Sequence, residues 1–99
     1  MHPVIHHPKA EAELAEAAQF YNRRRPGLGG EFWEEVDARV VVLAEQPDRF
    51  RQLEDDVRQC SLRRFPYVIL YRQTVAGVQI LALKHHARHP DYWKHRKTT

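Results

Sequence analysis

Two kinds of side chain in the second half of the sequence could handle an anionic partner. Adjacent arginines, Arg63 and Arg64, stand just before the apolar run YVILY, and arginine makes planar, bidentate contacts with carboxylates and phosphates. Three histidines, His85, His86 and His89, follow the next apolar run, and histidine titrates close enough to neutral pH for acid–base work. These residue types therefore favour anion binding or proton transfer.

The histidines are poorly spaced for a metal site. Neighbouring residues on a strand point to opposite faces, so His85 and His86 cannot easily share an ion. The surrounding segment offers no cysteine, and Asp91 is its single acid, whereas a zinc site is built from several such ligands. We therefore expect no metal and no cofactor, and we expect one histidine to anchor the tail through a hydrogen bond.

Charge is divided unevenly along the 99 residues. Residues 1–56 contain seven Lys and Arg against twelve Asp and Glu, and residues 57–99 contain nine against one, within a net charge of +3. Such a dipole attracts a polyanion at one end and a basic partner at the other. The alternative interpretation is that both halves are simply solvated.

Cysteine usage and the first residues bear on the compartment. Cys60 is the single cysteine, so no disulfide forms within the chain, which fits a reducing cytoplasm. Lying on an apolar strand face, Cys60 is expected to be a buried thiol and not a nucleophile. The start, MHPVIHHPKA, has neither a basic segment nor a long apolar stretch, and no apolar run approaches the ~20 residues of a membrane span. We expect a cytoplasmic protein with no signal peptide and no membrane partner.

The elements that would position these groups begin with a strand and two helices. A short strand at Val4 and Ile5 precedes a helix that starts at Pro8, a residue suited to the first helical position. The apolar stripe of this helix has a helical spacing: Ala10, Leu14, Ala17 and Tyr21. Pro26 and the following glycine end it. A second apolar stripe predicts another helix: Leu28, Phe32, Val36, Val40 and Leu43. This helix should end near Gln46, because the next residue is proline.

Beyond a polar connector, residues 47–56, the apolar period changes to two. We expect strands over residues 57–65, 67–73 and 78–85, with Gly77 at positive φ in the last turn. On the first of these strands Arg63 and Arg64 would point to opposite faces. The open face lies beside the basic tail, so the two arginines would extend one positive surface. Charges that protect an edge strand from pairing with another chain are the alternative.

This order of elements is an α+β pattern. The prediction is an N-terminal short strand and a two-helix antiparallel hairpin packed on a three- to four-stranded, largely antiparallel sheet. One domain is expected over residues 1–99. The tail should form a short helical turn around Tyr92 and Trp93, with Trp93 packed on the sheet or the hairpin. The acids of the second helix are expected to form a solvated face: Glu31, Glu34, Glu35 and Asp37.

Two stretches of the second half fit together as a family pattern. They are LRRFPYVILYR, Leu62–Arg72, and VQILALKHHARHPDYWKHR, Val78–Arg96. With the helical hairpin and its EQPDRF exit before them, they resemble the RelE/ParE superfamily of toxins from bacterial type II toxin–antitoxin modules, and ParE-like members in particular. The resemblance covers nearly the whole chain.

The resemblance implies two different activities for one fold. ParE-like members are regarded as inhibitors of DNA gyrase, and this is the function we expect. RelE-like members are ribosome-dependent endoribonucleases that cut messenger RNA without a metal, and this is the alternative. An inactive toxin homologue is a further alternative. In both groups a cognate antitoxin neutralises the toxin, so a homodimer or a toxin–antitoxin hetero-oligomer is open.

The ribonuclease pattern is only half present. Lysines that such members place on the first strand of the meander are absent around Gln59 and Ser61, and Val68 stands where an arginine is usual. A basic residue, as His85 or His86, and a tyrosine, Tyr92, are present. A rearranged site would have to supply base, acid and charge stabilisation from four residues: Arg63, His86, Arg88 and Tyr92.

For a ParE-like toxin, contacts with the target or the antitoxin are instead expected from arginines. The candidates are Arg63, Arg64, Arg72, Arg88 and Arg96. Their positive charge would suit an acidic antitoxin segment.

Overall fold

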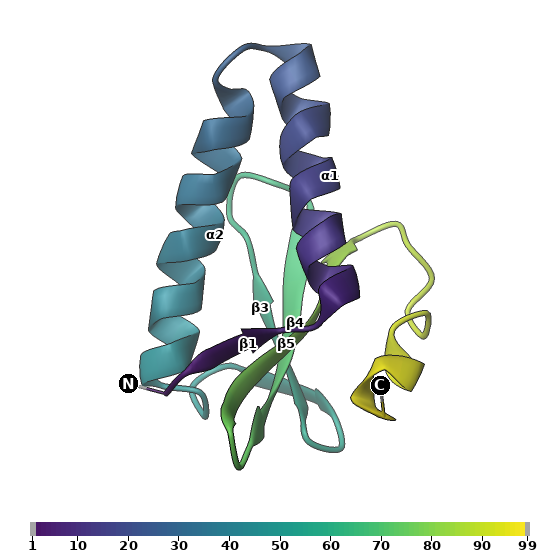
Figure 1. Ribbon diagram of the computed structural model, residues 1–99. Helices are drawn as coiled ribbons and strands as arrows, with labels where there is room; N and C mark the ends of the chain where they lie inside the picture. Colours follow the sequence, from purple (N-terminus) through teal and green to yellow (C-terminus); the bar gives the residue numbers. More distant parts are fainter. Residues whose placement is uncertain (1, 99) are drawn as a thin grey trace.

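The computed structural model describes residues 2–98, so the end residues of the predicted 1–99 domain lie outside the described residues. The elements are β1 (Val4–His6), α1 (Pro8–Arg24), α2 (Leu28–Glu45), β2 (Arg51–Glu54), β3 (Val57–Ser61), β4 (Tyr67–Thr74), β5 (Gly77–His85) and a C-terminal 3-10 turn, η1 (Lys94–Thr98). Figure 1 shows α1 and α2 side by side over the sheet, as predicted from their apolar stripes.

The helical hairpin is built by local signals that the sequence carries. Pro8 is the first residue of α1, and the His7 imidazole Nδ1 accepts the backbone N–H of Lys9 at 3.1 Å, which caps the helix. At the other end, the Asn22 side chain accepts the backbone N–H of Gly27 at 2.9 Å. A Cβ on Gly29 would run into the backbone of α1, so this glycine lets the two helices approach closely.

The sheet has the strand order β1-β5-β4-β3-β2, with β1 parallel to β5 and every other pair antiparallel. The predicted α+β class and the hairpin layer are confirmed, but the sheet has five strands. The extra strand is β2, which lies within the segment interpreted as a polar connector. Its first three residues are all exposed, so an edge strand of this kind shows no apolar alternation.

The strand predicted over residues 57–65 is shorter than expected. β3 ends at Ser61, and Leu62 N–H and Tyr67 O then close a loop with a 2.9 Å hydrogen bond. Pro66 has no N–H for a sheet ladder, which favours a loop here. Arg63 and Arg64 therefore lie in the β3–β4 loop, and the expectation that they occupy opposite faces of a strand is wrong.

Apolar side chains fill both faces of the sheet. On the helix side Phe32, Leu43 and Tyr71 are almost fully buried, together with Cys60. The prediction that Cys60 is a buried structural residue is therefore confirmed, and burial raises the pKa of its thiol. On the other face Trp93 of the tail, 1% exposed, packs with residues of β3, β4 and β5. The predicted packing of Trp93 on the sheet is confirmed, and the Lys94 N–H donates to the Asp91 carbonyl at 3.2 Å, which closes a turn around Tyr92 and Trp93 that leads into η1.

Candidate functional site

β5 is longer than its neighbour β1, which leaves part of its edge without a strand partner. β1 pairs only with Val78, Gln79 and Ile80. Beyond them, the Glu13 carboxylate accepts the backbone N–H of Leu83 at 3.1 Å, and the Arg96 guanidinium donates to the carbonyl of Leu81 at 3.0 Å. Since unpaired buried backbone groups are costly, these side chains stand in for a missing strand.

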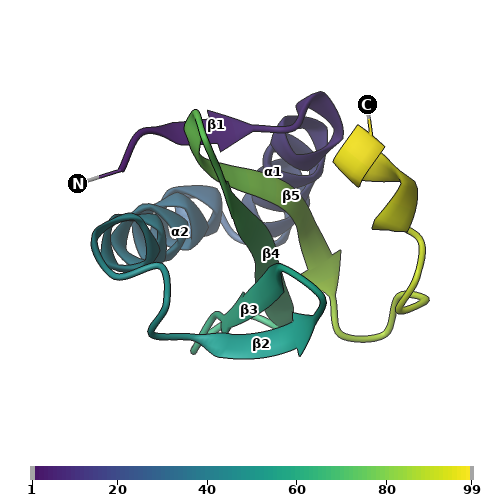
Figure 2. The same ribbon diagram turned by 90° about the horizontal axis from the view of Figure 1, so that it is seen from below.

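Glu13 is also the point at which the tail is attached to α1. Its carboxylate accepts two hydrogen bonds from the Arg96 guanidinium, at 2.9 and 3.1 Å, one from the Tyr92 hydroxyl at 2.7 Å and one from Arg88 at 3.3 Å. The Glu13 and Arg96 side chains are only 12% and 4% exposed. Figure 2 shows the C-terminal turn beside α1, where these contacts place it. Three predicted site residues thus converge on an acid that we did not select from the sequence.

The surroundings of Tyr92 hold it in the protonated form. Its ring contacts the guanidinium groups of Arg88 and Arg96, whose central carbons are 3.8 and 4.9 Å from the ring centroid. Burial, and then the hydrogen bond to Glu13, raise the pKa of Tyr92 far above its usual 10. The phenol is therefore a hydrogen-bond donor to Glu13, and it is poorly suited to act as a base at neutral pH.

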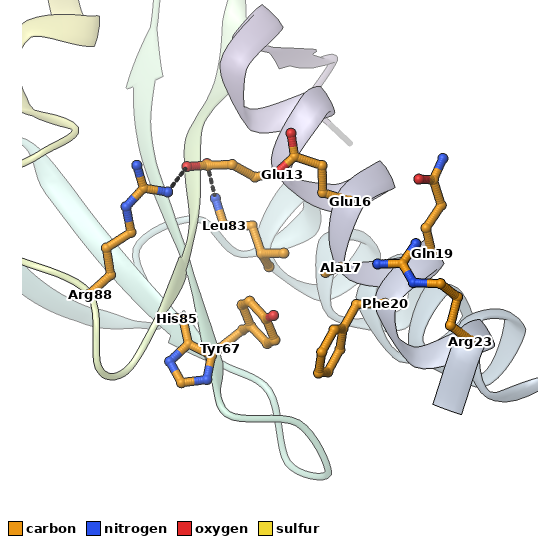
Figure 3. A pocket seen from close by; sticks show the side chains of 10 residues that line it. All are labelled: Glu13, Glu16, Ala17, Gln19, Phe20, Arg23, Tyr67, Leu83, His85 and Arg88. Atoms are coloured by element: carbon orange, nitrogen blue, oxygen red, sulfur yellow. Dashed lines mark hydrogen bonds and ion pairs between the residues drawn. The ribbon is translucent and has the colours of Figure 1, made fainter. Parts of the chain in front are cut away.

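Beside this attachment point an open groove, called here the Phe20 groove, runs between α1 and the ends of β4 and β5. It has a volume of about 400 Å³, and Figure 3 shows the residues that line it: Glu13, Glu16, Ala17, Gln19, Phe20, Arg23, Tyr67, Leu83, His85 and Arg88. The Phe20 side chain is 41% exposed, and the rings of Tyr67 and His85 meet edge to face with centroids 5.1 Å apart. Arg23 and Arg88 place positive charge on two sides of these aromatic rings.

The two adjacent arginines of the β3–β4 loop lie against α2. The Glu35 carboxylate accepts the backbone N–H groups of Arg63 and Arg64, the latter at 3.1 Å, and the Arg64 guanidinium binds Glu31 at 2.8 Å. Arg25 also binds Glu31, and the hydrogen bonds from Arg64 and Arg25 lower the pKa of the Glu31 carboxyl group. The acids Glu31 and Glu35 are thus loop anchors, and the prediction of a purely solvated acidic face is wrong for them.

One continuous positive surface is therefore not what the fold builds. Arg63 and Arg64 meet acids of α2, whereas Arg88 and Arg96 meet Glu13 of α1. Arg72 is occupied elsewhere: it donates to Gln79 at 3.0 Å and to the carbonyl of Lys97 at 2.9 Å, and it lies 3.4 Å from Asp56. The expectation of a shared surface is wrong because acids in the first half are distributed among the arginines of the second.

The four residues considered for catalysis are only partly brought together. Arg88 and Tyr92 are in contact at Glu13. Arg63 lies in the loop on α2, and His86 is exposed, with its backbone N–H bound to the carbonyl of Pro66 at 2.9 Å. Among residues 2–98, no side-chain hydrogen bond or ion pair joins Arg63 or His86 to Arg88 or Tyr92.

Sequence reasoning missed the acids that organise both sites, although one signal was available. Glu13 follows Ala10 by three residues and precedes Ala17 by four, so it borders the apolar stripe of α1. A carboxylate at the border of a core stripe needs a partner. The partner itself, Arg96, is 83 residues away, and only the fold shows that pairing.

The described part of the chain also bears on metal binding and on membrane insertion. Within residues 2–98, no group of three or more His, Cys, Asp or Glu side chains is arranged to hold a metal ion. In that same range, neither helix has the combination of length and apolarity that crossing a bilayer requires.

Comparisons with known proteins bear on the family and the fold of the chain. The family model described as the ParE toxin of the type II toxin–antitoxin system parDE matches residues 4–90. Two relatives called Toxin ParE2, from Mycobacterium tuberculosis strains CDC 1551 / Oshkosh and ATCC 25618 / H37Rv, are each 30% identical over 86 residues, which is 86% of this chain and 82% of theirs. A solved structure, the chromosomal ParDE TA system from P. aeruginosa, has a chain of similar fold, with a TM-score of 0.75 and 20% identity over 86% of this chain and 96% of that one.

Proposed function

This chain belongs to the ParE toxin family of type II toxin–antitoxin systems, and from that membership we propose that it inhibits DNA gyrase and is neutralised by a cognate antitoxin. The cytoplasm is the proposed site of action, because gyrase works on DNA there. Family membership also carries the expectation of a dedicated antitoxin partner. The oligomeric state proposed is a toxin–antitoxin hetero-oligomer.

The observation that best supports antitoxin capture is the Phe20 groove. Its aromatic floor would accept an apolar side chain, and Arg23 and Arg88 stand beside that floor. An acidic segment with an apolar anchor fits this combination, since arginine pairs with carboxylates and desolvated aromatic pockets supply most of the affinity of such interfaces. Arg63 and Arg64 remain proposed contacts of the same or another partner. Arg96 is 4% exposed and Arg72 21% exposed, so they would contribute indirectly.

The ribonuclease alternative receives less support from the geometry. Base, acid and charge stabiliser must meet at one reacting phosphate, and Arg63 and His86 stand apart from Arg88 and Tyr92. Tyr92, one of the four residues considered for a ribonuclease site, donates its hydroxyl proton to Glu13. We therefore place gyrase ahead of messenger RNA as the target.

Induction of the protein in a bacterium tests the proposed function. DNA synthesis, protein synthesis and messenger RNA length are followed separately after induction. The expected result is stalled replication and a DNA damage response with intact messages. Early loss of translation with cleaved messages would point to the ribonuclease, and unimpaired growth would point to an inactive homologue.

Capture in the Phe20 groove has its own test. Arg23→Glu places a negative charge in the groove, and Arg51→Glu makes the same charge change on the exposed strand β2. Arg23→Glu should weaken antitoxin binding about tenfold or more, because a like charge then faces the acidic segment. Arg51→Glu should leave antitoxin binding unchanged. Equal effects of the two variants would contradict the proposal that the antitoxin binds in the Phe20 groove.

A further inference from the structure

A second groove, called here the Trp33 groove, lies between α1, α2 and β1. It has a volume of about 350 Å³ and an apolar lining with two carboxylates: His6, Glu11, Leu14, Trp33, Val36, Asp37 and Val40. Trp33 is 38% exposed, although it is one of the largest apolar side chains in the chain. Exposed tryptophan at the border of an apolar groove is typical of a protein-binding surface.

The charge of this groove differs from that of the Phe20 groove, because two carboxylates line it without any Lys or Arg, whereas Arg23 and Arg88 accompany the two acids of the Phe20 groove. Glu11 and Asp37 form no ion pair with any residue in the described range 2–98. In the Phe20 groove, by contrast, Glu13 is paired with Arg96 and Arg88, and Arg23 lines the same groove as the second acid, Glu16. The Trp33 groove thus combines apolar area with uncompensated negative charge, and a basic partner would complement it.

We propose that the Trp33 groove docks the target protein of this toxin through a basic amphipathic helix of that target. An apolar stripe on such a helix would meet Trp33 and Val40, and flanking Lys or Arg would meet the two carboxylates. A target that holds DNA carries basic residues for the phosphates, which agrees with this charge. The inference rests on the proposed toxin function and deepens it by assigning target and antitoxin to different grooves.

Two other occupants fit the groove less well. In a two-fold dimer each groove would face its own copy, so Glu11 and Asp37 of one copy would meet the same acids of the other and repel them. An acidic antitoxin segment would meet the same repulsion. These two occupants are separate outcomes of the test below.

Charge reversal in the groove tests the proposal. The variant Glu11→Lys/Asp37→Lys changes both carboxylates at exposed positions, and the matched control Glu45→Lys changes an exposed carboxylate at the end of α2 that does not line the groove. Trp33→Ala is a second variant that removes the apolar anchor. Each is measured for growth inhibition on induction, for affinity to the purified cognate antitoxin, for sedimentation as monomer or dimer, and for folding by circular dichroism.

The proposal predicts separation of two properties. About tenfold more of the folded double variant, or of Trp33→Ala, should be needed for the same growth inhibition as the wild type, because a tryptophan or a charge at the centre of an interface contributes strongly to binding. The affinity of both variants for the antitoxin should stay within about twofold of the wild-type value. The Glu45→Lys control should match the wild type. Undiminished growth inhibition by the folded double variant would overturn the inference and leave the proposed function standing. Loss of antitoxin affinity in the variants would assign the groove to the antitoxin, and loss of a dimer would assign it to a second copy; either result would overturn the inference. A wild-type protein that does not inhibit growth would overturn the proposed function as well.

Discussion

Replacing Glu13 by glutamine should loosen the whole C-terminal tail. The substitution keeps the size of the side chain and removes the charge that Arg96, Tyr92 and Arg88 share. The glutamine NH2 group would face guanidinium donors, and either Arg96 or the backbone N–H of Leu83 would lose its acceptor. The stability of the tail and the closure of the β5 edge therefore depend on one carboxylate.

The size of the effect follows from burial. Removing one partner of a fully buried ion pair costs about 3–5 kcal/mol, because the other charge is left unpaired. Glu13 keeps 12% exposure, and the glutamine carbonyl still accepts one hydrogen bond, so we expect a loss of about 2–3 kcal/mol in the free energy of unfolding. For a chain of this length, such a loss lowers the melting temperature by about 10 °C or more.

Urea unfolding, followed by circular dichroism and by the fluorescence of Trp93 in a Trp33→Phe background, measures this loss. Glu16→Gln is the matched control, since Glu16 is exposed one turn along the same helix, and it should change stability by less than about 0.5 kcal/mol. A Glu13→Gln protein as stable as the Glu16→Gln control would show that the Glu13 carboxylate does not hold the tail.

Three further predictions concern the fold around this site. Burial, and then neighbouring cations, hold the pKa of His7 below its usual 6.5, and the neutral ring accepts the N–H of Lys9. The contribution of His7 to stability is therefore present above about pH 6.5 and is lost as the pH falls through the folded-state pKa. Urea midpoints measured between about pH 7.5 and pH 5 should fall more steeply for the wild type than for His7→Asn. Trp93→Ala should lower the free energy of unfolding by about 3–5 kcal/mol in the same experiment, because the indole is 1% exposed. Gly77→Ala should cost more than about 1 kcal/mol at φ +136°, whereas Gly30→Ala, where a Cβ meets nothing, should stabilise α2 by about 0.5–1 kcal/mol when melting temperatures are compared.

Some of the fold was predictable because local signals and tertiary packing agree. The apolar stripes and the flanking prolines place both helices within a residue or two, and the two-residue period places β4 and β5. The sequence does not predict β2, because Arg51, Gln52 and Leu53 are all exposed on an edge strand. Such a strand has no buried face and therefore no alternation of apolar and polar residues. The end of β3 was misplaced because Arg63 and Arg64 were interpreted by strand alternation, whereas Glu35 holds them in a loop.

The candidate site was predictable in its residue types but not in its partners. Arg88, Tyr92 and Arg96 were selected for their chemistry, and the fold does bring them together. What joins them is Glu13 of α1, and a pair separated by 75 residues or more leaves no periodic trace in the sequence. Long-range ion pairs of this kind are set by how the helix layer and the tail meet at the edge of β5, which is a property of the tertiary structure.

The supercoiling of relaxed plasmid DNA by purified gyrase, in the presence of the purified protein with and without its cognate antitoxin, tests the central claim most directly. If this protein is a gyrase inhibitor, the toxin alone abolishes supercoiling and equimolar antitoxin restores it. Full supercoiling in the presence of excess folded toxin would contradict the claim.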